Sequence, residues 1–334
     1  MTASDSYTRR VVIALSVAAI FVIAWKLSDV FILLFGGLIL ATVLRAMAGG
    51  VSRLTTVPER VAIAMVIIGL LMLLSVLTWL IGGRVAQQIE ELRSTLPQAI
   101  AAASQWLQTS PFGPPLLEMW ESAKEGGVPW VRVAFFATVG LGGIVNAVLI
   151  AVVGFYLATS PGVYFRGFLR LVPADSRKRV DAALLAAGQG LQRWLFGQML
   201  SMTAIGALTA LGLYFLGMPL AVSLGLIAGL LAFVPFFGPI AFAILAVVLA
   251  FTQGPTQALH VGLLCFAIQQ LEGYVLTPFI QRWAVALPPV LGLVSVVIFG
   301  LLFGVMGVLF ATPLMVVLMI VVEKLYVEGE GAPA

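Results

Sequence analysis

The sequence has very little charge and almost no cysteine or histidine. Charged residues make up only 10% of the 334 residues, with a single cysteine, Cys265, and a single histidine, His260. This excludes a disulfide framework and a zinc site built from Cys and His, so no metal site is expected. There is also no Gly-Lys-Ser/Thr loop for a nucleotide phosphate, no Ser/His/Asp set and no pair of aspartates in an apolar run. We therefore expect neither an enzyme nor a cofactor.

Most of the sequence is apolar. Apolar residues make up 61% of the chain, and the mean hydropathy is +1.12, which is more than the core of a water-soluble protein can bury. Uncharged runs recur at 11–25, 30–44, 61–83, 133–160, 194–281 and 283–322. The last four exceed the roughly 20 residues that a helix needs to cross a bilayer. The sequence predicts an all-α integral membrane protein, a polytopic helical bundle of about six to eight transmembrane helices.

Basic residues predict the orientation of this bundle, because cytoplasmic loops are enriched in Lys and Arg. They gather before the first span, after the second and after the fourth, at Arg9, Arg10, Arg45, Arg53, Arg60, Arg166, Arg170, Arg177, Lys178, Arg179 and Arg193. We expect both termini in the cytoplasm, including a tail over 323–334. Because the basic residues form no single stripe, a nucleic-acid partner is not expected.

The same pattern divides the N-terminal part of the chain. Residues 1–83 are expected to hold helices 1–3, the first of them an uncleaved span, and residues 133–160 to form helix 4. Between them, 84–132 is predicted to be an extracytoplasmic amphipathic segment, a pair of helices interrupted at Pro97. Residues 161–193 are predicted to form a cytoplasmic basic amphipathic helix.

Residues 194–322 are predicted to be the transport core, because two of their apolar stretches have awkward lengths. Helix 194–217 is followed by 219–251, and helix 257–281 by 286–322; each second stretch is too long for one span and too short for two. Each also breaks near its middle, at Pro235, Gly238 and Pro239 or at Gly300, Gly304 and Gly307. Irregular backbone at membrane depth must line a cavity, which favours two re-entrant hairpins over full spans.

The two hairpins are expected to form an inverted repeat, an arrangement in which paired interrupted segments mark the binding site of a transporter. "LGL" at 224–226 recurs at 291–293, and the pair Phe237-Gly238 recurs at Phe303-Gly304. The alternative, in which 219–251 crosses the membrane completely, stays open from the sequence.

Four segments resemble the autoinducer-2 exporter (AI-2E) family of bacterial permeases. They are "LFGQML" at 195–200, "LGMPLAVSLGLIAGLLAFVPFFGPI" at 216–240, "QQLEGYVLTPFIQ" at 269–281 and "LFGVMGVLFATPLMV" at 302–316. Gly273 and Tyr274 depart from the family, in which asparagine is frequent there. The resemblance implies efflux of a small polar solute across the bacterial inner membrane by a homo-oligomer, with a pentamer expected. Some relatives look like Na⁺/H⁺ antiporters.

Glu272 is the only formally charged residue between 194 and 281, and a charge near the midplane costs about 3 kcal/mol on insertion scales. One interpretation is a structural carboxyl that hydrogen-bonds hairpin backbone. The other is a group that exchanges a proton or cation at the substrate site. The residues expected to bind substrate or coupling ion are Glu272, Gln270, Gln269, Gln198 and Thr277. Those expected to line the site at breaks are Pro235, Gly238, Pro239, Pro278, Gly300, Gly304 and Gly307.

Two functions follow for these residues. The first is a secondary transporter that exports a small hydrophilic, signal-molecule-like solute from a midplane site between the two hairpins. The second is a Na⁺(Li⁺)/H⁺ antiporter that uses Glu272. The expected partners are the lipid bilayer and either a small polar solute or a monovalent cation, and the expected coupling ion is H⁺ or Na⁺.

Overall fold

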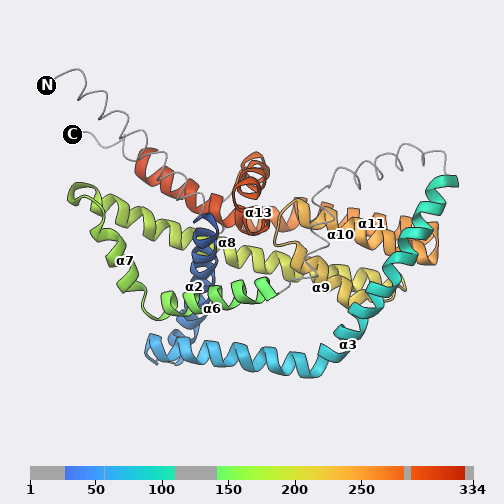
Figure 1. Ribbon diagram of the computed structural model, residues 1–334, viewed down its shortest axis with the longest axis horizontal. Coiled ribbons are helices and arrows are strands. Elements are labelled where there is room, and N and C mark those ends of the chain that lie inside the picture. The colour runs from blue at the N-terminus through green and yellow to red at the C-terminus, as the bar shows by residue number, and fades with distance from the viewer. Residues whose placement is uncertain (1–26, 56, 110–140, 282–286, 328–334) are drawn as a thin grey trace, which may run out of the picture.

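The computed structural model describes residues 27–55, 57–109, 141–281 and 287–327, and every regular element in these ranges is helical (Figure 1). The predicted all-α fold class is confirmed. Four of the described helices are long and apolar enough to cross a membrane, or five if one bent pair is a single span. The predicted first span at 11–25 lies outside the described residues, so the expected total of six to eight stays a prediction.

Helices α2 (Ser28–Thr55) and α6 (Leu141–Thr159) pack closely because glycines remove side chains from their contact. Gly37 lies against Val153, and Gly154 lies against Leu40, as is common between helices in membranes. Arg45 of α2 donates a hydrogen bond to the carbonyl of Ala158 (3.1 Å) and forms an ion pair with Glu59, the first residue of α3. This arginine therefore joins three helices.

Helix α3 (Glu59–Thr109) is continuous over 51 residues. The predicted boundary at 83/84 falls inside it, and the prediction that Pro97 interrupts the helix is wrong. A proline removes one backbone donor, and here packing holds the helix on both sides of the loss. Leu92, Leu96 and the fully buried Ala99 all contact the core of the C-terminal half.

Helix α7 (Pro161–Arg170) leaves the end of α6 at an angle of 86° and leads into α8 (Ala174–Phe215). The predicted boundary between a cytoplasmic helix ending at 193 and a span beginning at 194 falls inside α8. No proline or other strong helix breaker stands near Arg193, so the basic first half and the apolar second half form one helix. Figure 1 shows α8 running through the middle of the molecule.

The segment after α8 turns back on itself. It comprises α9 (Ala221–Leu231), α10 (Phe237–Ala250) and the short turn η2 (Phe251–Gln253), and α11 (Pro255–Leu271) follows. The side-chain amide of Gln257 donates to the carbonyl of Leu216 (2.6 Å), so the beginning and end of the segment lie at the same end of α8. This is the geometry of a re-entrant hairpin, and we call 218–253 hairpin 1.

Hairpin 1 packs on α8 along a seam of small residues. Gly225 and Gly229 of α9 face Gly206 of α8, and a Cβ added at Gly229 would lie only 2.8 Å from the backbone carbonyl of Met202. The two backbones therefore approach more closely than larger side chains would allow, and we call this contact the glycine seam.

Helix α13 (Pro289–Val322) also reverses direction, at Gly304, whose φ of 61° and ψ of −140° are not helical. Val296 and Ala311 belong to one buried cluster, although 15 residues of straight helix would separate them by about 22 Å. Phe237, at the start of α10, packs against the same cluster. We call 289–322 hairpin 2; the two hairpins meet at this point. The short π-helical segment η4 (Glu323–Val327) follows.

Candidate functional site

The break in hairpin 1 is a tight turn between α9 and α10. Phe236 has a positive φ of 66°, and a Cβ at Gly238 would overlap the backbone carbonyl oxygen of Leu231, so only glycine fits there. The side-chain amide of Gln198, on α8, donates to the carbonyl of Ala232 (2.7 Å). Gln198 thus satisfies a backbone oxygen that the broken helix leaves free, as a break within an apolar environment requires.

The break in hairpin 2 has similar parts. Gly304 supplies the positive φ, and a Cβ at Gly307 would overlap the carbonyl oxygen of Phe299. In the sequence comparison of the two hairpins, Gly238 corresponds to Gly304. In the structure, Gly238 corresponds to Gly307, because each of these two glycines lies against a backbone carbonyl oxygen. The sequence match therefore identified the right turn in each hairpin and paired the wrong glycines.

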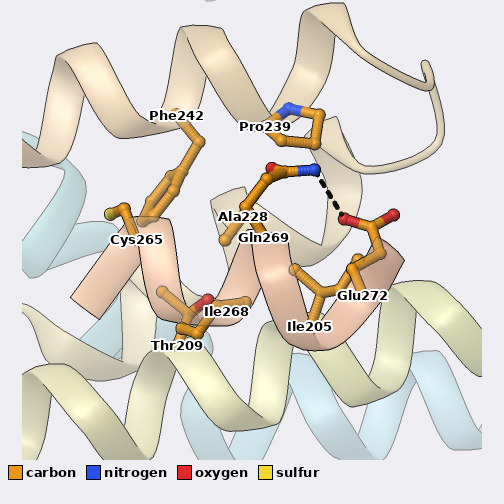
Figure 2. A pocket seen from close by; sticks show the side chains of 9 residues that line it. All are labelled: Ile205, Thr209, Ala228, Pro239, Phe242, Cys265, Ile268, Gln269 and Glu272. Atoms are coloured by element: carbon orange, nitrogen blue, oxygen red, sulfur yellow. Dashed lines mark hydrogen bonds between the residues drawn. The ribbon is translucent and has the colours of Figure 1, made fainter. Parts of the chain in front are cut away.

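A small cavity lies between α8, hairpin 1 and α11 (Figure 2). Its volume is about 20 Å³, which accommodates one water molecule or a bare monovalent cation. An organic solute does not fit in this conformation. The walls consist of Ile205, Thr209, Ala228, Pro239, Phe242, Cys265, Ile268, Gln269 and Glu272.

Helix α11 brings Glu272 to this cavity by helical spacing. Cys265, Ile268, Gln269 and Glu272 are three, four and seven residues apart and share one face. The amide of Gln269 donates to the Glu272 carboxylate (Nε2 to Oε2, 3.3 Å), as Figure 2 shows. The carboxyl therefore has a polar partner on its own helix.

The chain widens to a π-helix at Glu272. The segment η3 (Glu272–Leu276) separates α11 from α12 (Thr277–Gln281), and the Thr277 N–H donates to the carbonyl of Glu272, five residues back. Pro278 explains the local change, because a proline has no N–H and its ring crowds the carbonyl four residues earlier. Such π-bulges are frequent at functional sites.

The structure brings together three of the residues expected at the site, namely Glu272, Gln269 and Pro239. It places the others elsewhere. Gln198, Pro235 and Gly238 belong to the turn of hairpin 1, which Gln198 holds by its hydrogen bond. Gln270 and Pro278 are exposed, and Thr277 is partly buried on α12. The turn of hairpin 2 contains Gly300, Gly304 and Gly307.

Sequence reasoning missed Thr209 and Cys265. Thr209 had a detectable signal, because it follows Gln198 by 11 residues, or about three helical turns, and so lies on the same face of α8. Ser201, Ile205 and Thr209 are indeed all buried. Cys265 had the same kind of signal, because it precedes Glu272 by seven residues, or about two helical turns, and so lies on the same helix face.

This arrangement suits binding of a proton or a monovalent cation more than chemistry on a substrate. A carboxylate and an amide oxygen are hard oxygen ligands. In the part of the chain that the structure describes, no three His, Cys, Asp or Glu side chains gather to hold a metal ion.

Known proteins resemble this chain over long stretches. A family model described as "AI-2E family transporter" matches residues 13–326. YrrI of Bacillus subtilis, named as an inferred transport protein, is 32% identical over 148 residues, which are 44% of this chain and 42% of YrrI. A similarly named protein of Mycobacterium tuberculosis is 34% identical over 142 residues, 42% of this chain and 39% of its own length. Each aligned stretch thus spans less than half of the curated relative. The family match covers nearly the whole chain, which therefore belongs to the AI-2E transporter family of membrane transporters.

Proposed function

We propose that this chain is a secondary transporter that exports a small hydrophilic, signal-molecule-like solute and couples this export to H⁺ or Na⁺ at Glu272. The observation that carries the proposal is the cavity that Glu272 and Gln269 share with Pro239, at the turn of a broken segment. Paired broken segments mark transporter sites, and an ionisable residue inside an apolar span indicates function. The proposal assigns the chain no catalytic residue.

The size of the cavity separates binding of the coupling ion from binding of the solute within this proposal. About 20 Å³ holds the coupling ion but not an organic solute, so the solute needs a conformation in which the hairpins have moved. The same size favours a second candidate, a Na⁺(Li⁺)/H⁺ antiporter in which the cation at Glu272 is itself the cargo.

The proposed setting is the bacterial inner membrane, with both termini in the cytoplasm. Helix α11 supports a surrounding of lipid or of further copies, because it exposes a row of large apolar side chains, Leu259, Leu263 and Phe266. A homo-oligomer is part of the proposal, and the pentamer stays a prediction.

Glu272→Gln tests the proposal, because glutamine keeps the size and hydrogen bonding of the side chain and cannot carry a charge. In proteoliposomes, we expect the solute flux driven by a Na⁺ or H⁺ gradient to be at least tenfold lower in the variant than in the parent protein. Exchange of solute across equal concentrations should persist. Flux of Na⁺ without any organic solute would identify the antiporter.

The matched control is Glu323→Gln, since Glu323 lies exposed at the end of α13, away from the cavity. It should transport like the parent protein. Gradient-driven flux at the parental level in Glu272→Gln would assign Glu272 a structural role and overturn the proposal.

A further inference from the structure

The wall of the cavity at Glu272 follows α11 for about two helical turns. It includes Cys265 and Glu272, seven residues apart, which corresponds to about 10 Å of helix. Figure 2 shows the carboxylate at one end and Thr209, with Cys265, toward the other. The cavity lies between α8 and α11, with the carboxylate at one end of its wall and Thr209 and Cys265 toward the other, and we call this space the crevice.

Thr209 gives the far end of this crevice an unusual polarity. The residue is only 1% exposed, and its hydroxyl makes no hydrogen bond within the described part of the chain. Other helical hydroxyls behave differently; that of Thr203, for example, donates to the carbonyl of Met199 (2.8 Å). Among the described residues, no fully buried side-chain oxygen lacks a hydrogen-bond partner, so the small exposed part of Thr209 includes its hydroxyl oxygen, which faces the crevice. Water in the crevice would supply the partner.

The far end points toward the end of α8 that carries Leu216 and the start of α11. Thr209 is six residues from the last residue of α8, Phe215, or about 9 Å. The basic residues around Arg177 lie at the opposite end of the same helix and are expected in the cytoplasm. The crevice thus leads from Glu272 toward the extracytoplasmic side.

Apolar side chains close the crevice beyond Thr209. Leu264 of α11 fills the space left by Gly212 of α8, where an added Cβ would lie 2.5 Å from a Leu264 methyl. Leu213 and Val261 beside it are completely buried. Side chains block the crevice here, and no backbone segment of the described residues runs across it. A change in the rotamer of Leu264 or a small movement of α11 can therefore open it.

We propose that this crevice is the inner part of a hydrated path from the extracytoplasmic side to Glu272, with Thr209 holding water in it and Leu264 closing it. The path would deliver H⁺ or a monovalent cation, and in this it rests on the proposed function of Glu272. Thr209 is a polar wall of the path and not a ligand of the ion held at Glu272.

Cys265 is the only cysteine in the sequence and lies in the crevice wall, so the unmodified protein carries its own reporter. Right-side-out membrane vesicles would be treated with a small, membrane-impermeant cationic methanethiosulfonate, which forms a mixed disulfide with a thiol in contact with water. We expect Leu264→Ala to raise the labelling rate of Cys265 at least tenfold.

Leu263→Ala is the matched control, because the neighbouring Leu263 is 57% exposed and lies outside the crevice wall. It should label at the parental rate, and a Cys265→Ala protein should not label at all. On the Leu264→Ala background, Thr209→Val should reduce the rate severalfold, whereas Thr209→Ser should not. Each variant is compared at equal amounts of folded protein in the membrane.

Equal rates in Leu264→Ala and Leu263→Ala, or labelling only from inverted vesicles, would overturn the path. Labelling needs no transport, so this result is independent of the Glu272→Gln flux. A labelled path together with full flux in Glu272→Gln would remove the proposed function and leave the hydrated crevice in place.

Discussion

Phe236 adopts a conformation that a side chain of its size rarely takes. Its φ of 66° and ψ of −52°, with the Phe237 N–H donating to the carbonyl of Pro235 (2.8 Å), describe a γ-turn of the rare, strained kind. Such strain costs on the order of 1–3 kcal/mol and persists where the surrounding structure enforces it. Here the bond from Gln198 and the close approach of Gly238 to Leu231 enforce it.

Gly238→Ala is predicted to disrupt this turn. The new Cβ would overlap the backbone oxygen of Leu231, which cannot move aside as a flexible side chain could, and overpacking of this kind costs about 1–3 kcal/mol. We expect a lower midpoint of thermal unfolding in detergent and a loss of transport.

The control for this substitution is Gly188→Ala in α8, where nothing lies within 4 Å of the added Cβ. Alanine favours a helix over glycine by about 1 kcal/mol, so this variant should unfold at the same temperature or higher. Similar behaviour of the two variants would show that Gly238 is not constrained by the turn.

At the scale of elements, the C-terminal half of α3 is fastened to hairpin 1. The hydroxyl of the buried Ser223 donates to the side-chain amide oxygen of Gln88. Further along α3, Trp106 packs on Phe251 with ring centroids 5.4 Å apart. Helix α3 therefore contacts hairpin 1 near both α9 and η2, and we call this contact the α3 clamp.

Gln88→Leu should loosen the α3 clamp. One hydrogen bond contributes about 0.5–1.5 kcal/mol, so amide hydrogen exchange in residues 88–106 should accelerate by up to about tenfold. Gln87→Leu is the control, because Gln87 is exposed on the neighbouring face. Equal exchange in both variants would show that the Gln88–Ser223 bond adds nothing to the clamp.

Periodicity and the lengths of apolar runs predicted the helical class and the turns near residues 236 and 304. They did so because bilayer thickness and backbone satisfaction constrain every membrane protein in the same way. They could not predict that α3 passes through Pro97, since packing against a distant core decides that. They also could not assign Gln198 to the carbonyl of Ala232, because the register of hairpin 1 on α8 determines which group meets it. The structure places Glu272 in the wall of a cavity, and its role as the centre of the site stays a prediction.

At the scale of the whole molecule, both ends of hairpin 1 lie at one end of α8. The bond from Gln257 to Leu216 requires α11 to begin on the side of the membrane where α8 ends. A segment that crossed the membrane between them would put these residues on opposite sides.

This geometry predicts the sidedness of two engineered cysteines on a Cys265→Ala background. Thr256→Cys, at the exposed start of α11, should react with an impermeant maleimide added from outside. Ser176→Cys, at the start of α8, should react only from the cytoplasmic side. Labelling of both from the same side would require hairpin 1 to cross the membrane completely.

The glycine seam between α8 and α9 has a mechanical consequence. Helices that interlock large side chains resist sliding, because ridges must climb out of grooves. Gly206, Gly225 and Gly229 bring two backbones together without such interlocking at their contact. The seam therefore resists separation of α8 and α9 far more than it resists sliding of α9 along α8. The hydrogen bond from Gln198 to Ala232 sets the position from which α9 would slide.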